Sequence, residues 1–183
     1  LGYVAGGGSF SREADPYKYP SPYKSIETYR QLQALREFEE TYPFKTMEGV
    51  RKLIESDRSQ VVPYRDLGRL ATFAGRQEEA LSSLKKAAFL RPNDPRLHNF
   101  LGLGYYAFGR FAESLAEYQV ALGLAPGQQT ARYNLALALV KLGRVDEAVK
   151  ALEEVVEKEP KNLFGLNNLA FLHLDHYKDP RKA

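Results

Sequence analysis

The segment that decides the fold reads Leu101-Gly102-Leu103-Gly104-Tyr105 and continues through Gly109-Arg110 to Pro126. The glycine-arginine pair and the closing proline recur at an interval of 34 residues, at Gly75-Arg76, Gly143-Arg144, Pro92 and Pro160. A unit of this length cannot bury its own apolar face, so neighbouring copies must stack on a shared core. The interval therefore predicts an array whose outer surface is free to recognise something, and we expect binding to be the function.

Small residues recur where two helices have to approach closely. A glycine or alanine follows leucine midway along the first helix of each copy, at Gly68, Gly102 and Ala136. A larger side chain there would force the two helices of the hairpin apart. The glycine of the recurring pair should end the first helix in the left-handed conformation that glycine adopts without steric cost. We therefore expect two antiparallel helices in each copy.

The second helix of each copy repeats its own pattern. An acidic residue in its first turn complements the helix dipole, at Glu79, Glu113 and Glu147. The small residue that follows should pack against the neighbouring helix, at Ala80, Ser114 and Ala148. The core stripe then continues through Leu84, Tyr118 and Leu152. These positions are the ones expected to hold the stack together.

These residues resemble the tetratricopeptide repeat family, whose pattern is matched by Leu101-Gly102 and Tyr105 and by the small residue and closing proline of the second helix. The resemblance covers Val61 to Ala183. It implies an all-α fold in which antiparallel helix hairpins stack into a right-handed superhelical array. The position where the family often has tryptophan holds Tyr64, His98, Arg132 and Leu166. This departure should cost some core volume without threatening the fold.

Three parts of the chain are expected. Residues 1–24 are predicted to form an extended Tyr/Pro tail or linker, because prolines at 16, 20 and 22 oppose a helix. Residues 25–60 are predicted to form a degenerate helical hairpin that caps the stack, with its first helix running to about Thr41. Residues 61–183 form the array, divided into 61–94, 95–128, 129–162 and a partial copy at 163–183.

Both ends of the chain leave alternatives open. The partial copy is either a C-terminal cap or the edge of a longer array, and its apolar first helix favours the longer array. The start at Leu1 rather than at methionine leaves open that residues 1–5 are the tail of a removed or truncated anchor. We expect a cytoplasmic protein, with a membrane-tethered or exported one as the alternative.

The sequence offers little for catalysis, and we expect no enzyme, no cofactor and no metal site. There is no cysteine, no glycine-rich phosphate loop and no serine-nucleophile motif. The three histidines are His98, His173 and His176. Only His173 and His176 have a spacing that could share a metal, and a convincing site needs three or four convergent ligands.

Charge and hydropathy exclude two classes of partner. The net charge is only +3, and basic residues do not gather into the stripe that nucleic-acid binding requires. No apolar run approaches the roughly 20 residues that span a bilayer, so we expect no direct membrane insertion in this segment. A protein or peptide ligand therefore remains the expected partner, with a homo-oligomer as a further possibility.

The resemblance assigns a binding groove to the first helices, which line the concave face in this family. Side chains that alternate with the core stripe on those helices should face the partner. The predicted groove residues are Arg65, Arg69, Arg96, Asn99, Phe100, Leu103, Tyr106, Tyr133, Asn134, Leu137, Asn167, Asn168 and Phe171.

Two features of this groove suggest what it binds. Its asparagines could hold an extended peptide backbone through paired donors and acceptors, or could be structural, since asparagine is common at this position of the repeat. Its aromatic and aliphatic residues, flanked by three arginines, suit an apolar-anchored peptide or helix with an acidic end, although some of them could instead pack between repeats.

One subfamily, the chaperone adaptors, clamps the terminal carboxylate of a peptide with lysine, asparagine and arginine side chains. The corresponding positions here hold Arg65, Arg69, Phe100, Thr130 and Asn134. We therefore expect a partner other than a heat-shock chaperone tail. The predicted function is a non-catalytic scaffold that binds a partner peptide or helix. Self-assembly, by end-to-end stacking or tail-in-groove exchange, and a module of a longer anchored or exported protein are the alternatives.

Overall fold

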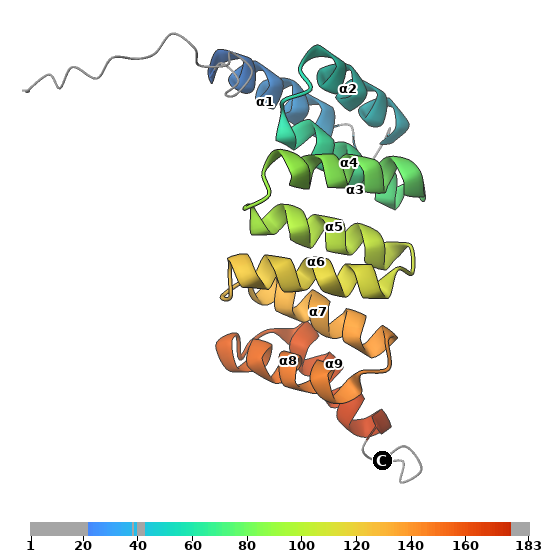
Figure 1. Ribbon diagram of the computed structural model, residues 1–183, viewed down its shortest axis with the longest axis vertical. Coiled ribbons are helices and arrows are strands. Elements are labelled where there is room, and N and C mark those ends of the chain that lie inside the picture. Colours follow the sequence, from blue (N-terminus) through green and yellow to red (C-terminus); the bar gives the residue numbers. More distant parts are fainter. Residues whose placement is uncertain (1–21, 38, 40–42, 177–183) are drawn as a thin grey trace, which may run out of the picture.

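The computed structural model describes residues 22–37, 39 and 43–176, and this part of the chain contains helices and turns but no strands. Its helices are α1 (Pro22–Arg36), α2 (Pro43–Ser56), α3 (Val61–Phe73), α4 (Gln77–Leu90), α5 (Pro95–Ala107), α6 (Phe111–Leu124), α7 (Gln129–Lys141), α8 (Val145–Lys158) and α9 (Leu163–His176). Figure 1 shows them stacked in chain order along the long axis, from α1 and α2 at one end to α9 at the other. Each helix from α2 to α9 packs on the helix before it. The all-α array predicted from the sequence is confirmed.

The three recurring glycines end the first helices as expected. Gly75, Gly109 and Gly143 have φ values of 70°, 72° and 74°, in the left-handed region. The backbone N–H of the arginine that follows then donates to a carbonyl five residues earlier, as Arg110 does to Tyr105 at 2.9 Å. This geometry reverses the chain tightly enough for the second helix to pack back on the first.

The small residues lie at close helix contacts. A Cβ atom at Gly68 would come within 2.5 Å of Leu84 Cγ, and one at Gly102 would come within 2.5 Å of Tyr118 Cε1. The small residues of the second helix are fully buried, and the Ser114 hydroxyl donates to the Gly102 carbonyl at 2.8 Å. Glycine at these positions lets a large core residue cross directly over the neighbouring backbone.

The N-terminal hairpin departs from the predicted boundaries. Helix α1 begins at Pro22, inside the segment expected to be extended, because proline is compatible with the first turn of a helix, where its missing N–H costs nothing. The helix ends at Arg36, earlier than expected, and Thr41 and residues 1–21 lie outside the described residues. The apolar side of α1 and α2 covers α3 through Leu32, Met47 and Val50.

Candidate peptide-binding groove

The first helices of the repeats form one continuous face. Helix α3 contacts α5 directly, and α5 contacts α7, in addition to their contacts with the second helices. Residues one interval apart therefore form rows across the stack. Two rows carry four predicted groove residues each, and the apolar one is Arg69, Leu103, Leu137 and Phe171. Leu103 is 38% exposed and Phe171 is 62% exposed. A partner lying across the first helices would meet this row.

Aromatic side chains flank the row. Phe100, Tyr106 and Tyr133 are partly buried, and they pack against the core clusters of their own repeats. The Tyr106 ring meets Phe111 edge-on at 5.3 Å between centroids. Burial raises the pKa of the Tyr106 hydroxyl, with a smaller contribution from Tyr133. The sequence left open whether these aromatic residues pack between repeats or form part of the binding surface. They pack within the stack and remain partly exposed at its surface.

The asparagines bond to neighbouring repeats. Asn134 Nδ2 donates to Asn99 Oδ1 at 3.0 Å, and both side chains are buried. Asn168 Nδ2 donates to the Tyr133 hydroxyl at 3.1 Å and to its own helix at the Phe164 carbonyl at 2.8 Å. Asn167 is exposed on α9. The amide N–H groups of Asn134 and Asn168 thus stabilise the stacking of repeats, and the structural interpretation accounts for both.

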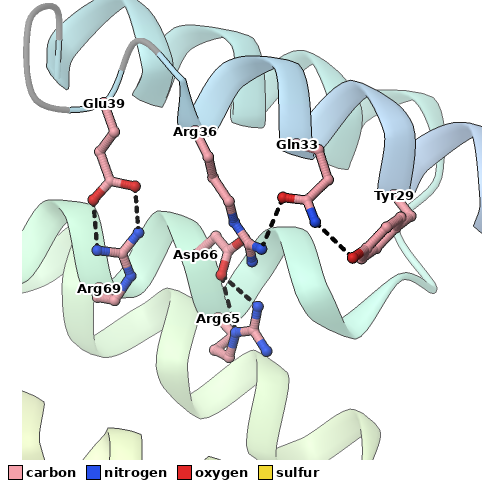
Figure 2. A network of polar contacts seen from close by, with 7 residues as sticks. All are labelled: Tyr29, Gln33, Arg36, Glu39, Arg65, Asp66 and Arg69. Carbon is pink, nitrogen blue, oxygen red and sulfur yellow. Dashed lines mark hydrogen bonds and ion pairs between the residues drawn. The ribbon is translucent and has the colours of Figure 1, made fainter.

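All three predicted arginines are bound by carboxylates. Both terminal nitrogens of Arg69 donate hydrogen bonds to the Glu39 carboxylate, at 2.6 Å each. Arg65 donates a hydrogen bond to Asp66 Oδ1 at 2.7 Å. Arg36 of α1 donates to the other oxygen of Asp66 at 2.7 Å. Figure 2 shows these side chains joining α1 and the segment after it to α3. The third, Arg96, pairs with Asp94 at the start of α5.

These contacts favour the charged forms of Glu39 and Arg69. The hydrogen bonds from Arg69 outweigh the cost of burial and lower the pKa of Glu39. The same pairing raises the pKa of Arg69. A second ion pair, Arg51 with Glu79 at 2.7 Å, joins α2 to α4 and lowers the pKa of Glu79 through the hydrogen bond from Arg51. The N-terminal hairpin is therefore attached to the first repeat by charged contacts as well as by apolar ones.

A pocket of about 280 Å³ opens between α3 and α5. It gathers four of the thirteen predicted groove residues, and the other nine lie outside it. Its lining residues are Arg69, Thr72, Phe73, Leu84, Phe100, Leu103, Gly104, Tyr106 and Ala107. The sequence did not identify Thr72, Leu84, Gly104 and Ala107 as site residues. Gly104 could have been identified from the sequence, because it is a glycine where the other copies have Leu70, Ala138 and Leu172.

Other candidate chemistry gains no support from the described part of the chain. Within it, no three histidine, aspartate or glutamate side chains lie close enough together to bind a metal ion, and no helix is both long and apolar enough to cross a membrane. His98 contacts Glu117 and the Pro92 carbonyl, each at 2.8 Å. The side chain of His176 lies outside the described residues.

Stacked hairpins with an open face on their first helices define a helical-repeat scaffold for protein interaction. Two family models, both described as tetratricopeptide repeat, match residues 65–129 and 105–165. The chain belongs to the tetratricopeptide repeat family. Repeats of this family are in general non-catalytic interaction modules.

Comparison with individual proteins agrees with this assignment. The human protein O-mannosyl-transferase TMTC1 is 35% identical over 96 residues, which are 52% of this chain and 10% of that protein. This chain spans about a tenth of the length of the first curated relatives that it matches. Among solved structures, a MamA RS-1 double mutant has a TM-score of 0.73 at 19% identity and covers 87% of each chain. The first repeat domain of Spaghetti (RPAP3), bound to an HSP90 peptide, has a TM-score of 0.60 at 24% identity over 64% of this chain and 94% of that one.

Proposed function

We propose that the face formed by α3, α5, α7 and α9 binds a peptide or helix of a partner protein. The observation that carries the proposal is the row of apolar side chains that continues from repeat to repeat, through Leu103 and Leu137 to Phe171. Exposed apolar side chains that form a contiguous surface mark interaction sites more often than scattered ones do. The RPAP3 domain, which shares this fold, is bound to the peptide SRMEEVD.

The mode of binding differs from a terminal-carboxylate clamp. Arg65 and Arg69 already bind Asp66 and Glu39, and the amide N–H of Asn134 already donates to Asn99. Recognition therefore rests on apolar contact across the first helices, with polar groups at the rim. We retain the expectation that the partner is not a chaperone tail.

The proposal is tested by selecting ligands from a display library of random peptides of about twelve residues. Methyl NMR spectra are then recorded with an enriched peptide. We expect shifts at Leu103 and Leu137, on the first helices. The matched control methyls are those of Val120 and Leu124, which are also exposed but lie on the second helix α6. Shifts confined to α6, or no enriched peptide at all, would refute the proposal.

Self-association is a second candidate, because α9 exposes apolar side chains along one side. Three exposed leucines are separated by three and then eight residues, spacings that keep side chains on one face of a helix. They are Leu163, Leu166 and Leu174. A second copy of the chain could cover them by end-to-end contact. Light scattering over a concentration series, with Leu166→Glu as the comparison, tests this candidate. A chain that stays monomeric at all concentrations rules it out.

A further inference from the structure

One repeat lacks a core side chain that the other copies have. Gly104 of α5 stands one interval from Leu70 and from Ala138, and two intervals from Leu172. Those three residues are buried in their own repeats. Glycine in the interior of a helix also weakens that helix relative to alanine. Helix propensity therefore gives no reason for a glycine at this position, and the reason lies in packing, because the buried Leu84 of α4 sits directly against the α5 backbone there.

The missing side chain lets Leu84 of α4 approach the α5 backbone and form part of the groove face. Gly104 lines the pocket of about 280 Å³ between α3 and α5. A Cβ atom added there would lie 2.7 Å from a terminal methyl of Leu84 and 3.9 Å from Thr72 Oγ1, both of which also line the pocket. The wall on the α3 side includes Phe73, which is 81% exposed. The pocket thus lies at the junction of the first and second regular repeats.

The polar groups that Thr72 and Arg69 bring to the pocket wall are already satisfied. The Thr72 hydroxyl donates to the Gly68 carbonyl at 2.8 Å, inside its own helix. The Arg69 guanidinium is held by both oxygens of Glu39, so its carbon stem is what it offers to the pocket. A polar ligand group buried here would lose its water without gaining these partners. An apolar side chain would bury its surface at no such cost.

The polar network that includes the pocket residue Arg69 has one more guanidinium than carboxylate. Three guanidinium groups, from Arg36, Arg65 and Arg69, share the two carboxylates of Asp66 and Glu39. Arg65 also lies over the ring of Phe100, a pocket residue, at 5.8 Å. An acidic group beside the bound side chain would balance the remaining charge.

We infer that this pocket is the anchor subsite of the groove and that it takes one large aliphatic or aromatic side chain from an acidic peptide segment of a partner protein. The inference rests on the proposed function and adds the location and chemistry of the anchor. Gly104 contributes to specificity because a side chain there would displace Leu84, which lines the pocket, and narrow the space for the ligand. The surplus arginine charge selects ligands in which a carboxylate lies near the anchor.

The test uses the full chain and peptides enriched from the display library. We expect enriched sequences to share a large apolar residue with aspartate or glutamate within a few positions. Gly104→Ala should weaken the binding of such a peptide at least tenfold in calorimetry. The matched control is Gly123→Ala on α6, where an added Cβ meets nothing within 4 Å. Phe73→Ser, at an exposed wall residue, is a second variant that should weaken binding without affecting folding.

The peptide supplies the test of charge. Replacing its acidic residue by the amide should weaken binding several-fold at low salt, and the difference should shrink as salt is raised. Unchanged affinity in both Gly104→Ala and Phe73→Ser overturns the inference. If the methyl spectra still report binding at Leu103 or Leu137, the proposed function survives that result. If those methyls do not shift either, both fail together.

Discussion

The side-chain amide of Asn134 on α7 donates a hydrogen bond to the amide oxygen of Asn99 on α5 at 3.0 Å, and both residues are buried. The contact joins two repeats inside the stack. We expect Asn134→Ala to lower the free energy of unfolding by about 1–2 kcal/mol, because Asn99 would keep its burial and lose its donor. Urea unfolding followed by circular dichroism measures the change.

Asn167→Ala is the matched control, since Asn167 is an exposed asparagine on a first helix. Its effect should stay within about 0.5 kcal/mol. In the double variant Asn99→Ala with Asn134→Ala, the loss should be smaller than the sum of the two single losses, because the residues share one contact. Equal losses at positions 134 and 167 would show that the contact contributes nothing.

The attachment of the N-terminal hairpin should depend on pH. The hydrogen bonds from Arg69 and Arg51 lower the pKa values of Glu39 and Glu79 below their ordinary value of 4.5. A carboxyl whose folded pKa is lowered contributes stability above its unfolded pKa, and this contribution is lost as the pH falls through the folded pKa. Replacing both glutamates by glutamine should therefore cost about 1–2 kcal/mol at pH 7 and much less near pH 3.

Urea unfolding at both pH values measures this difference. Glu48→Gln is the control, because Glu48 forms an exposed ion pair with Lys52 inside α2. Its effect should be small at both pH values. A cost at pH 3 as large as the cost at pH 7 would mean that the two carboxylates do not stabilise the folded state through their charge.

The repeat architecture could be predicted because its determinants are local and recur. Gly109 needs a left-handed backbone and Gly102 needs to clear Tyr118, and each requirement reappears one interval away. A residue type that recurs at the same position in several copies identifies its structural role without knowledge of the contacts. The helix hairpins, the glycine turns and the buried small residues all follow from that register.

The groove could be predicted only in outline. The partners of Arg65 and Arg69 come partly from the N-terminal hairpin, where Arg36 and Glu39 follow no 34-residue register. The sequence therefore showed these arginines as free charges. Asn134 was ambiguous because the same register position can face a ligand or the next repeat. Gly104 was overlooked because an absent side chain leaves no apolar residue to count.

The left-handed turn between α5 and α6 should tolerate no side chain without strain. Gly109 has a φ of 72°, where a Cβ atom costs about 1–2 kcal/mol. We expect Gly109→Ala to lower the melting temperature by several degrees. Gly123→Ala, in the last turn of α6 with open space around it, should instead leave the melting temperature unchanged or raise it slightly. A thermal scan that ranks the two variants in the opposite order contradicts this assignment.

His98 and Arg132 occupy the same position in successive repeats. Each side chain contacts the backbone carbonyl of the proline that closes the repeat before it. His98 Nε2 lies 2.8 Å from the Pro92 carbonyl oxygen, and Arg132 Nη2 donates to the Pro126 carbonyl at 2.9 Å. Each side chain also pairs with a glutamate of the second helix in its own repeat, at 2.8 Å in both cases. At the position where the family often has tryptophan, these two repeats thus have a polar side chain that contacts the closing proline of the repeat before it.

Exchange between the two residue types tests this shared role. His98→Arg should keep both contacts and change the free energy of unfolding by less than about 0.5 kcal/mol. His98→Ala should lose both contacts and cost about 1 kcal/mol, because the interaction of Glu117 with the first helix and the hydrogen bond to the loop carbonyl disappear together. Urea unfolding of both variants at one pH separates the outcomes. If arginine at position 98 destabilises as much as alanine does, the two positions are equivalent in sequence register only.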